Sequence, residues 1–203
     1  MKNLNIRWAT RSVRPAIGTG LMLAALGVSA CGSATVRDGE GSTYLIVQRL
    51  IMAEGGSSGA PFQSDVVSDD GSIFEDGAVV ELTAAMKDVT NVNGPTTNNL
   101  VTVSRYHVEF RRSDGRNTPG VDVPYAFDGA ATATVGVGGK TTIPFVMVRI
   151  QAKLEQPLSP LKGHGAAGVI STIADVTFYG RDQTGREVRV TGSTSVNFAD
   201  WAG

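Results

Sequence analysis

Apolar and polar residues alternate along most of the chain after residue 43, and this period of two predicts strands with one buried face. The pattern is clearest near the C-terminal end, where Ala174, Val176 and Phe178 occupy alternate positions and the run 188–198 repeats the pattern. The segment 181–186 lies between these two runs, and its Asp and Gly residues suit a tight turn. Together they predict a β-hairpin.

Other runs predict further strands of the same kind. In the run 146–154, five residues at alternate positions are expected to face the core: Val146, Val148, Ile150, Ala152 and Leu154. Strands are also predicted at 44–52, 79–86, 101–112, 121–127 and 131–137. No long stretch has the 3.6-residue period of a helix, so helices are expected only as short pieces. Seven or eight strands with turn-rich connections predict an all-β, antiparallel two-sheet sandwich.

The closing hairpin, from Thr177 through Asn197 and Phe198, resembles that of bacterial immunoglobulin-like or fibronectin type III-like domains. The Cys and Trp hallmarks of true immunoglobulin domains are missing. The resemblance implies an immunoglobulin-like sandwich over residues 44–203. Domains of this shape are commonly adhesive, scaffolding or substrate-presenting, but a fold does not determine a function.

The first 30 residues have the composition of a secretory leader. They contain Lys2, Arg7, Arg11 and Arg14 and no acidic residue, and an apolar run lies at 16–28. This run is shorter than the roughly 20 residues that a membrane-spanning helix needs, and small residues follow it. We therefore expect residues 1–30 to be a cleaved signal peptide rather than a permanent membrane span.

The single cysteine of the chain, Cys31, directly follows that leader. The sequence Val28-Ser29-Ala30-Cys31 resembles the lipobox of bacterial lipoproteins, although Leu is commoner than Val at the first position. The resemblance implies diacylglycerol transfer to the Cys31 sulfur and cleavage before this residue. The alternative is a plain secretory signal with a chance cysteine. Acylation also explains why one unpaired thiol is present in an oxidising compartment.

A lipid on Cys31 would hold the mature protein on a membrane without a transmembrane helix. Residues 31–43 are rich in glycine and polar residues, which predicts a flexible tether between the lipid and the domain. Lipoproteins retained at the inner membrane can carry Asp just after the Cys, whereas Gly32 and Ser33 follow here. We therefore expect a lipid-anchored protein of the bacterial cell envelope, at the outer membrane (periplasmic or surface face) if the cell is Gram-negative.

The chain after the leader is long enough for one domain with a substantial core and no disulfides. The leader holds four of the 18 basic residues and none of the 19 acidic ones, so the remaining chain is acidic overall. An acidic body argues against nucleic acid as a partner and against an electrostatic role at a membrane surface.

An acidic segment at 64–77 is the best candidate for a metal site. Its carboxylates are weak candidate ligands for calcium, which prefers hard oxygen donors: Asp65, Asp69, Asp70 and Asp76. The EF-hand pattern fails, because with Gly71 as the turn glycine the first and last ligand positions fall on Val66 and Gly77. A solvated loop with Asp-Gly turns is the favoured interpretation, and a calcium site is its alternative.

Four further features approach known sites. Residues 55–59 match the G-x-S-x-G nucleophile elbow without its strand-to-helix context, and residues 134–141 approach a phosphate-binding loop without its first glycine. Both are expected to be glycine-rich loops, the second within a hairpin.

His107 and His164 lack the partners for a zinc site and are expected at the surface. Triads assemble across a fold, but no serine stands out as a nucleophile.

Aromatic residues are sparse, and five of them offer surface for stacking on a sugar: Tyr106, Tyr125, Phe127, Tyr179 and Trp201. Most of them are expected in the core, with Trp201 packing the C-terminal end against the domain. Cys31 is therefore the one residue assigned to a site.

The anchor, the tether and the absence of a catalytic constellation predict a non-enzymatic envelope protein. Its sandwich would bind or space another envelope protein or a glycan, without a cofactor. One alternative is a calcium-dependent adhesion or glycan-binding module that uses the acidic segment. A second is an exported hydrolase whose site no motif marks.

Overall fold

The computed structural model describes residues 41–53 and 60–201. Cys31, the leader and the run 55–59 lie outside these described residues, as does most of the predicted tether. Within the described part, no helix has both the length and the hydropathy to cross a membrane.

Strands dominate the described residues. They are β1 (Thr43–Met52), β2 (Phe62–Asp65), β3 (Asp76–Met86), β4 (Val101–Arg111), β5 (Phe127–Val135), β6 (Lys140–Val148), β7 (Ile170–Asp182) and β8 (Glu187–Ala199). Short helices lie in the connections: η1 (Thr97–Asn99), α2 (Ile150–Leu154), η2 (Ser159–Leu161) and η3 (Gly165–Ala167). The predicted all-β class is confirmed.

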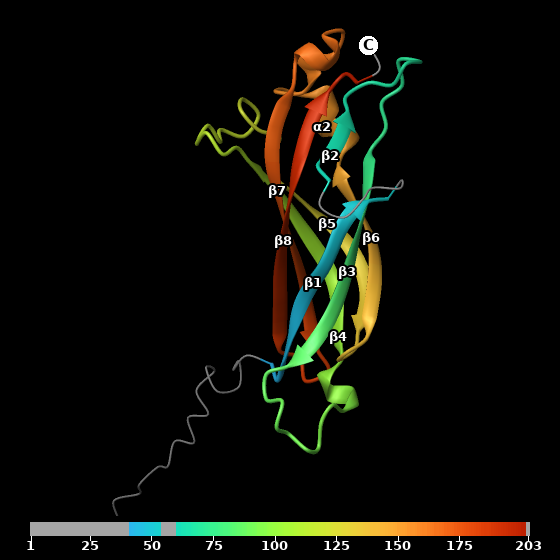
Figure 1. Cartoon of the computed structure of the whole chain (residues 1–203), viewed down its shortest axis with the longest axis vertical. Helices are drawn as coiled ribbons and strands as arrows, with labels where there is room; N and C mark the ends of the chain where they lie inside the picture. Colours follow the sequence, from blue (N-terminus) through green and yellow to red (C-terminus); the bar gives the residue numbers. More distant parts are fainter. Residues whose placement is uncertain (1–40, 54–59, 202–203) are drawn as a thin grey trace, which may run out of the picture.

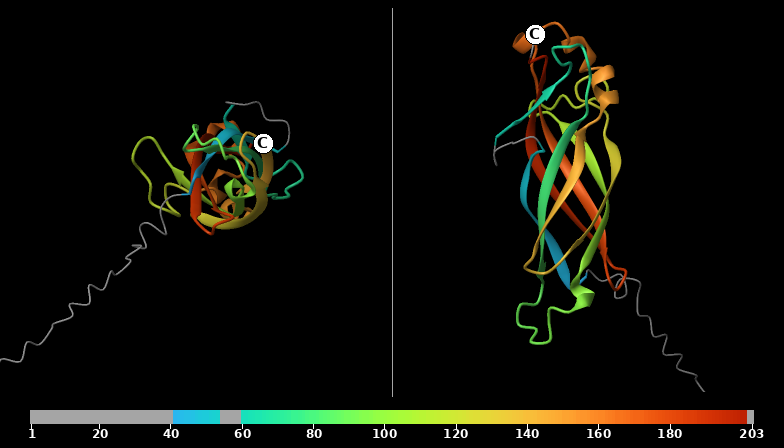
Figure 2. Two further views of the ribbon diagram at one scale, coloured as in Figure 1. Left: turned by 90° about the horizontal axis from the view of Figure 1, so that it is seen from below. Right: turned by 90° about the vertical axis from the view of Figure 1, so that its right-hand side faces the viewer.

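The strands form two strongly curled sheets that wrap around a shared core (Figure 1, Figure 2). One sheet has the order β1-β3-β6, and the other has the order β2-β8-β7-β4-β5. The strand β2 pairs with β8 in parallel, while the other pairings of these sheets are antiparallel. The wholly antiparallel arrangement that we predicted is therefore wrong at this edge, where a short strand from the loop after β1 joins the last strand.

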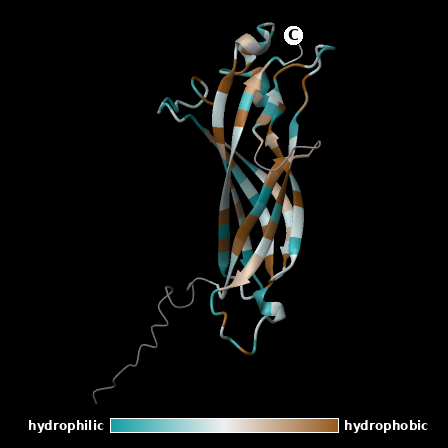
Figure 3. Ribbon diagram, viewed as in Figure 1, coloured by the Kyte–Doolittle hydropathy of each residue, from teal (hydrophilic) through white to brown (hydrophobic). Residues whose placement is uncertain are grey.

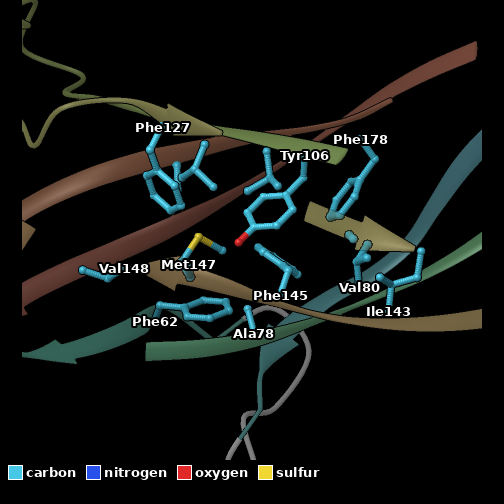
Figure 4. Close-up of a cluster of buried hydrophobic side chains, with 14 of the residues drawn as sticks. Phe62, Ala78, Val80, Tyr106, Phe127, Ile143, Phe145, Met147, Val148 and Phe178 are labelled. Carbon is cyan, nitrogen blue, oxygen red and sulfur yellow. The ribbon is translucent and has the colours of Figure 1, made fainter. Parts of the chain in front are cut away.

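The core consists of the inward residues of both sheets, and hydropathy alternates along the strands (Figure 3). At its centre, the ring of Tyr106 lies edge-on to Phe127 and Phe145 and tilted to Phe178 (Figure 4). The Val146 N–H donates a hydrogen bond of 3.1 Å to the Tyr106 hydroxyl, which joins β6 of one sheet to β4 of the other. Burial raises the pKa of Tyr106. Tyr106 and Phe127 are therefore core residues, as predicted.

The predicted C-terminal hairpin is confirmed by the pairing of β7 with β8. The loop between them is closed by Asp182, whose Oδ1 accepts hydrogen bonds from the N–H groups of Thr184 and Arg186 at 2.9 and 3.0 Å. Gly185 has φ +85°, a conformation that suits glycine. Burial alone would raise the pKa of Asp182, but a hydrogen bond from the Thr184 hydroxyl, together with these two bonds, lowers it overall.

The strand predicted at 146–154 is correct for its first three residues and wrong beyond Val148. The strand β6 ends at Val148, and the helix α2 follows from Ile150. The residues buried at the end of β6 are Met147 and Val148, whereas Ile150 and Leu154 are 37% and 54% exposed. Ile150 and Leu154 are four residues apart, and this spacing places two residues on one face of a helix as well as on one face of a strand. The pattern of apolar residues therefore does not distinguish a helix from a strand here.

Two smaller predictions also differ from the structure. Residues 121–126 lie outside the strands, and Val121 and Tyr125 are exposed. The strand predicted at 131–137 is the second half of β5, which ends at Val135. The strand β2 has four residues, too few for its alternation to stand out from that of the loop around it.

The two ends of the molecule carry different segments (Figure 1). We call one end the entry pole, because β1 begins there; it also holds the β3–β4 connection (87–100) and the β7–β8 turn (183–186). We call the other end the far pole, which holds the acidic segment and α2, and the β4–β5 connection (112–126) also lies toward it.

Candidate functional site

A groove of about 610 Å³ lies at the entry pole. Its walls come from the start of β1, from the end of β3, and from β4, β7 and β8: Gly41, Thr43, Tyr44, Lys87, Ser104, Arg105, Tyr179, Gly180, Arg181, Glu187, Val188 and Arg189. Four of these residues are cationic and one is acidic. The groove therefore concentrates positive charge in a domain that is acidic overall.

A row of three side chains crosses the outer face of the larger sheet in this groove. The register pairs Arg105 with Tyr179 and Tyr179 with Arg189, so the tyrosine stands between two arginines. The Arg105 guanidinium carbon lies 3.7 Å from the centre of the Tyr179 ring. This is a cation–π contact, which holds the guanidinium flat against the ring.

A β-bulge positions Arg105 for this contact. The register of β4 shifts between Val103 and Arg105 against both of its neighbours. Val103 and Tyr106 both face the core, so Ser104 and Arg105 are both exposed between them. If the residues after Val103 alternated strictly, Arg105 would face the core and Tyr106 the solvent.

The arginines of the groove have different partners. Arg105 lies 3.2 Å from Asp128, which also contacts the Nδ1 atom of His107 at 3.2 Å. Arg181 lies 2.9 Å from Glu187, and both side chains are largely exposed. Arg189 is exposed and has no ion-pair or hydrogen-bond partner among residues 41–53 and 60–201. Its guanidinium is thus available to a ligand.

This arrangement suits the recognition of an anion. A guanidinium presents N–H donors in a planar fork that matches the oxygens of a phosphate or a carboxylate. Arg105 is already held in place by Tyr179 and Asp128, so little of its freedom would be lost on binding. The groove offers such donors on β4 and β8, the two strands that flank β7, at positions fixed by the sheet.

The predicted calcium ligands do not come together. Asp76 contacts the Lys153 ammonium at 2.7 Å and accepts a hydrogen bond of 2.6 Å from the Ser64 hydroxyl. Asp65 accepts a hydrogen bond from the Trp201 N–H. Asp70 accepts one from the Ser72 N–H in its own turn. In the part of the chain that the structure describes, no three acidic, histidine or cysteine side chains are placed to share a metal ion.

The remaining motif residues are dispersed over the fold. The segment 134–141 is a turn with Gly138 at φ +72°, but its flanking strands belong to different sheets, so it is a crossing between sheets and not the hairpin that we expected. His107 is half-buried on β4 beside Asp128, and His164 is exposed in the far-pole connection before η3. Tyr125 is exposed, and Tyr179 is half-buried under Arg105.

Arg105 and Arg189 belong to no motif, and sequence patterns did not single them out. A usable signal did exist for one pair. The alternation of the closing hairpin places Tyr179 and Arg189 on its outer face, and the short turn fixes them as cross-strand neighbours. The net negative charge of the chain does not indicate that basic residues gather in one groove.

Comparison with known proteins leaves the function open. No protein-family model matches the chain, and a search of curated proteins finds no significant match. Among solved structures, the chain is similar to the sporulation control protein Spo0M from Bacillus subtilis, with 10% sequence identity and a TM-score of 0.30. The match covers 77% of this chain and 49% of that chain, so this chain spans about half the length of its neighbour.

Proposed function

We propose that the protein is a lipid-anchored, non-enzymatic binding module of the bacterial cell envelope, whose groove takes an anionic group. The observation that carries this proposal is the place of the groove. Gly41, the first described residue, lines it, and Cys31 lies ten positions earlier in the sequence. An extended chain spans about 3.5 Å per residue, so a lipid on Cys31 would keep the groove within about 35 Å of the membrane.

The chemistry of the groove defines the ligand class. The bound group would carry phosphate or carboxylate oxygens, because guanidinium forks bind these groups in two-point contacts. Lipid headgroups and phosphate-bearing envelope polymers both present such groups near the membrane. The β7–β8 hairpin supports an immunoglobulin-like sandwich as the scaffold, a shape that commonly presents binding surfaces at its ends.

Glycerol phosphate serves as a soluble probe of the groove. In NMR titrations of the full-length protein in maltoside micelles, we expect it to shift the side-chain resonances of Arg105 and Arg189. The variant Arg189→Gln should weaken binding about 10- to 100-fold, because a hydrogen bond to a charged group contributes about 1.5–3 kcal/mol.

The matched control is Arg116→Gln. Arg116 is a far-pole arginine that is 65% exposed and pairs with Asp114, so its replacement should leave the titration unchanged. Equal affinity in the wild type and Arg189→Gln, or shifts confined to far-pole residues, would contradict the assignment of the groove.

A further inference from the structure

We propose that the β3–β4 connection, residues 87–100, is a membrane-contact loop whose Val89 and Val92 side chains enter the interface of the membrane that carries the anchor. This inference rests on the proposed lipid anchor at Cys31. It adds an orientation: the entry pole would face the lipid, and the far pole would face away from it.

The two valines have unusual exposure. Val89 and Val92 are 88% and 93% exposed, more than any other large apolar side chain of the described residues. Single exposed apolar residues are common on proteins, but this pair occupies the tip region of one connection. From Val89 to Leu100 the sequence contains no charged residue. The charged residues of the loop, Lys87 and Asp88, are both at its start, so the stretch that carries the valines adds no further charge to the lipid interface, where a charge is costly.

Polar turns hold this loop in shape. The Asp88 carboxylate accepts hydrogen bonds from the Thr90 N–H and hydroxyl at 2.9 and 2.7 Å, and these bonds lower the pKa of Asp88. The Asn91 side chain accepts a bond of 3.0 Å from the Asn93 N–H. These bonds fix the turns on either side of Thr90 and Asn91 within the loop, and the two valines stay exposed there.

A second set of bonds fixes the loop to the start of the domain. The Asn99 side chain accepts a hydrogen bond of 2.7 Å from the Thr96 N–H and donates one of 2.7 Å to the Ser42 hydroxyl. Ser42 directly precedes β1, so the loop is tied to the point where the chain from Cys31 arrives. The loop extends past the strand ends at this pole (Figure 1, Figure 2). An anchor within about 35 Å of Gly41 thus keeps this pole, and the loop at its end, within reach of the lipid.

The charge of the surrounding surface favours the same orientation. The groove that adjoins the loop contains Arg105, Arg181 and Arg189, and cations near a membrane are attracted to anionic headgroups. The acidic segment 64–77 lies at the far pole. Apolar side chains that are flanked by cations are typical of surfaces that lie in the plane of the membrane interface.

The test places a polarity-sensitive fluorophore on Val92→Cys in the full-length protein. The protein is reconstituted in vesicles of phosphatidylcholine and phosphatidylglycerol, with and without lipids that carry a nitroxide quencher at the headgroup boundary. We expect a blue shift of the emission and loss of intensity with the quencher lipids. Val121→Cys is the matched control, because Val121 is 64% exposed on a far-pole connection. The wild type, whose single cysteine is Cys31, is labelled in parallel, so that any fluorescence from a label on Cys31 is measured separately.

The mass of the N-terminal peptide separates this inference from the proposed function. Quenching at residue 92 but not at residue 121 supports the membrane-contact loop, whether or not Cys31 carries lipid. An acylated Cys31 with residue 92 unquenched overturns the loop and leaves the anchor intact. A blue shift at residue 92 without quenching overturns it too, because another protein surface would then cover the valines. An unacylated Cys31 overturns the proposed anchor.

Discussion

Replacement of Lys153 by methionine is expected to lower the free energy of unfolding by about 3–5 kcal/mol, the usual cost of removing one partner of a buried ion pair. The Lys153 side chain is 2% exposed, and its Nζ atom lies 2.7 Å from the Asp76 Oδ1 atom. The other carboxylate oxygen of Asp76 accepts a hydrogen bond from the Ser64 hydroxyl. This contact joins α2 to β3 and β2, so Lys153→Met would leave a largely buried carboxylate without its cation.

The matched control for this variant is Lys140→Met. Lys140 also pairs with a carboxylate, that of Glu81 at 3.1 Å, but its side chain is 70% exposed. Exposed pairs contribute about 0–1 kcal/mol, so urea denaturation should show a small change for Lys140→Met and a large one for Lys153→Met. The double variant Lys153→Met with Asp76→Asn should regain part of the loss, because no buried charge remains. Equal losses for the two lysine variants would refute the account.

The loss in Lys153→Met should depend on pH. Burial raises the pKa of Asp76 above its ordinary value, although Lys153 and Ser64 oppose this effect. Without Lys153 the pKa would rise further. A carboxyl group whose pKa is raised by folding stabilises the fold below its ordinary pKa, and this stability is lost as the pH rises through the folded value. The difference between the variant and the wild type should therefore shrink in acid.

Substitution of Gly129 by alanine is the second change with a large expected effect, a loss of about 2–3 kcal/mol from overpacking. Gly129 pairs with Tyr106 in the register, and an added Cβ would overlap the Tyr106 ring and hydroxyl. The ring cannot move aside easily, because it is packed among Phe127, Phe145 and Phe178. Its hydroxyl also accepts a hydrogen bond from the Val146 N–H. The crowding must therefore shift β5 or break the bond between the sheets.

Gly136→Ala is the control for this substitution, since a Cβ there would meet only Leu100 at 3.6 Å, an ordinary contact. Thermal unfolding followed by circular dichroism should separate the two alanine variants. In a double-mutant cycle, Tyr106→Leu should relieve most of the cost of Gly129→Ala, because the shorter side chain vacates the space. Additive losses would show that the overlap with Tyr106 is not the cause.

Local patterns in the sequence predicted most of the strands. The hairpin of β7 and β8 follows from strict alternation and a turn with Asp and Gly, which are local signals. The end of β6 does not follow from such signals. Lys153 is buried because its ammonium meets Asp76, which precedes it by 77 positions, and no local pattern shows that a lysine will find such a partner.

The candidate site was predictable only in part. Tyr179 and Arg189 become neighbours as soon as the hairpin register is known. Arg105 reaches them through a bulge at Ser104, and a bulge is set by pairing with strands far along the chain. The groove also needs Tyr44, which comes from β1 of the other sheet, and Gly41, which precedes that strand. Its shape therefore depends on how the two sheets curl, which composition and periodicity do not specify.

The most direct test of the central claim is the mass of the peptide that begins at Cys31, measured on the protein from membrane fractions and compared with the fractionation of Cys31→Ala. We predict that Cys31 is the mature N-terminus, that it carries diacylglycerol, and that Cys31→Ala no longer behaves as a lipid-anchored protein. A free Cys31 thiol, with wild type and variant in the same fraction, would contradict the lipid anchor and with it the proposed place of the groove beside the membrane.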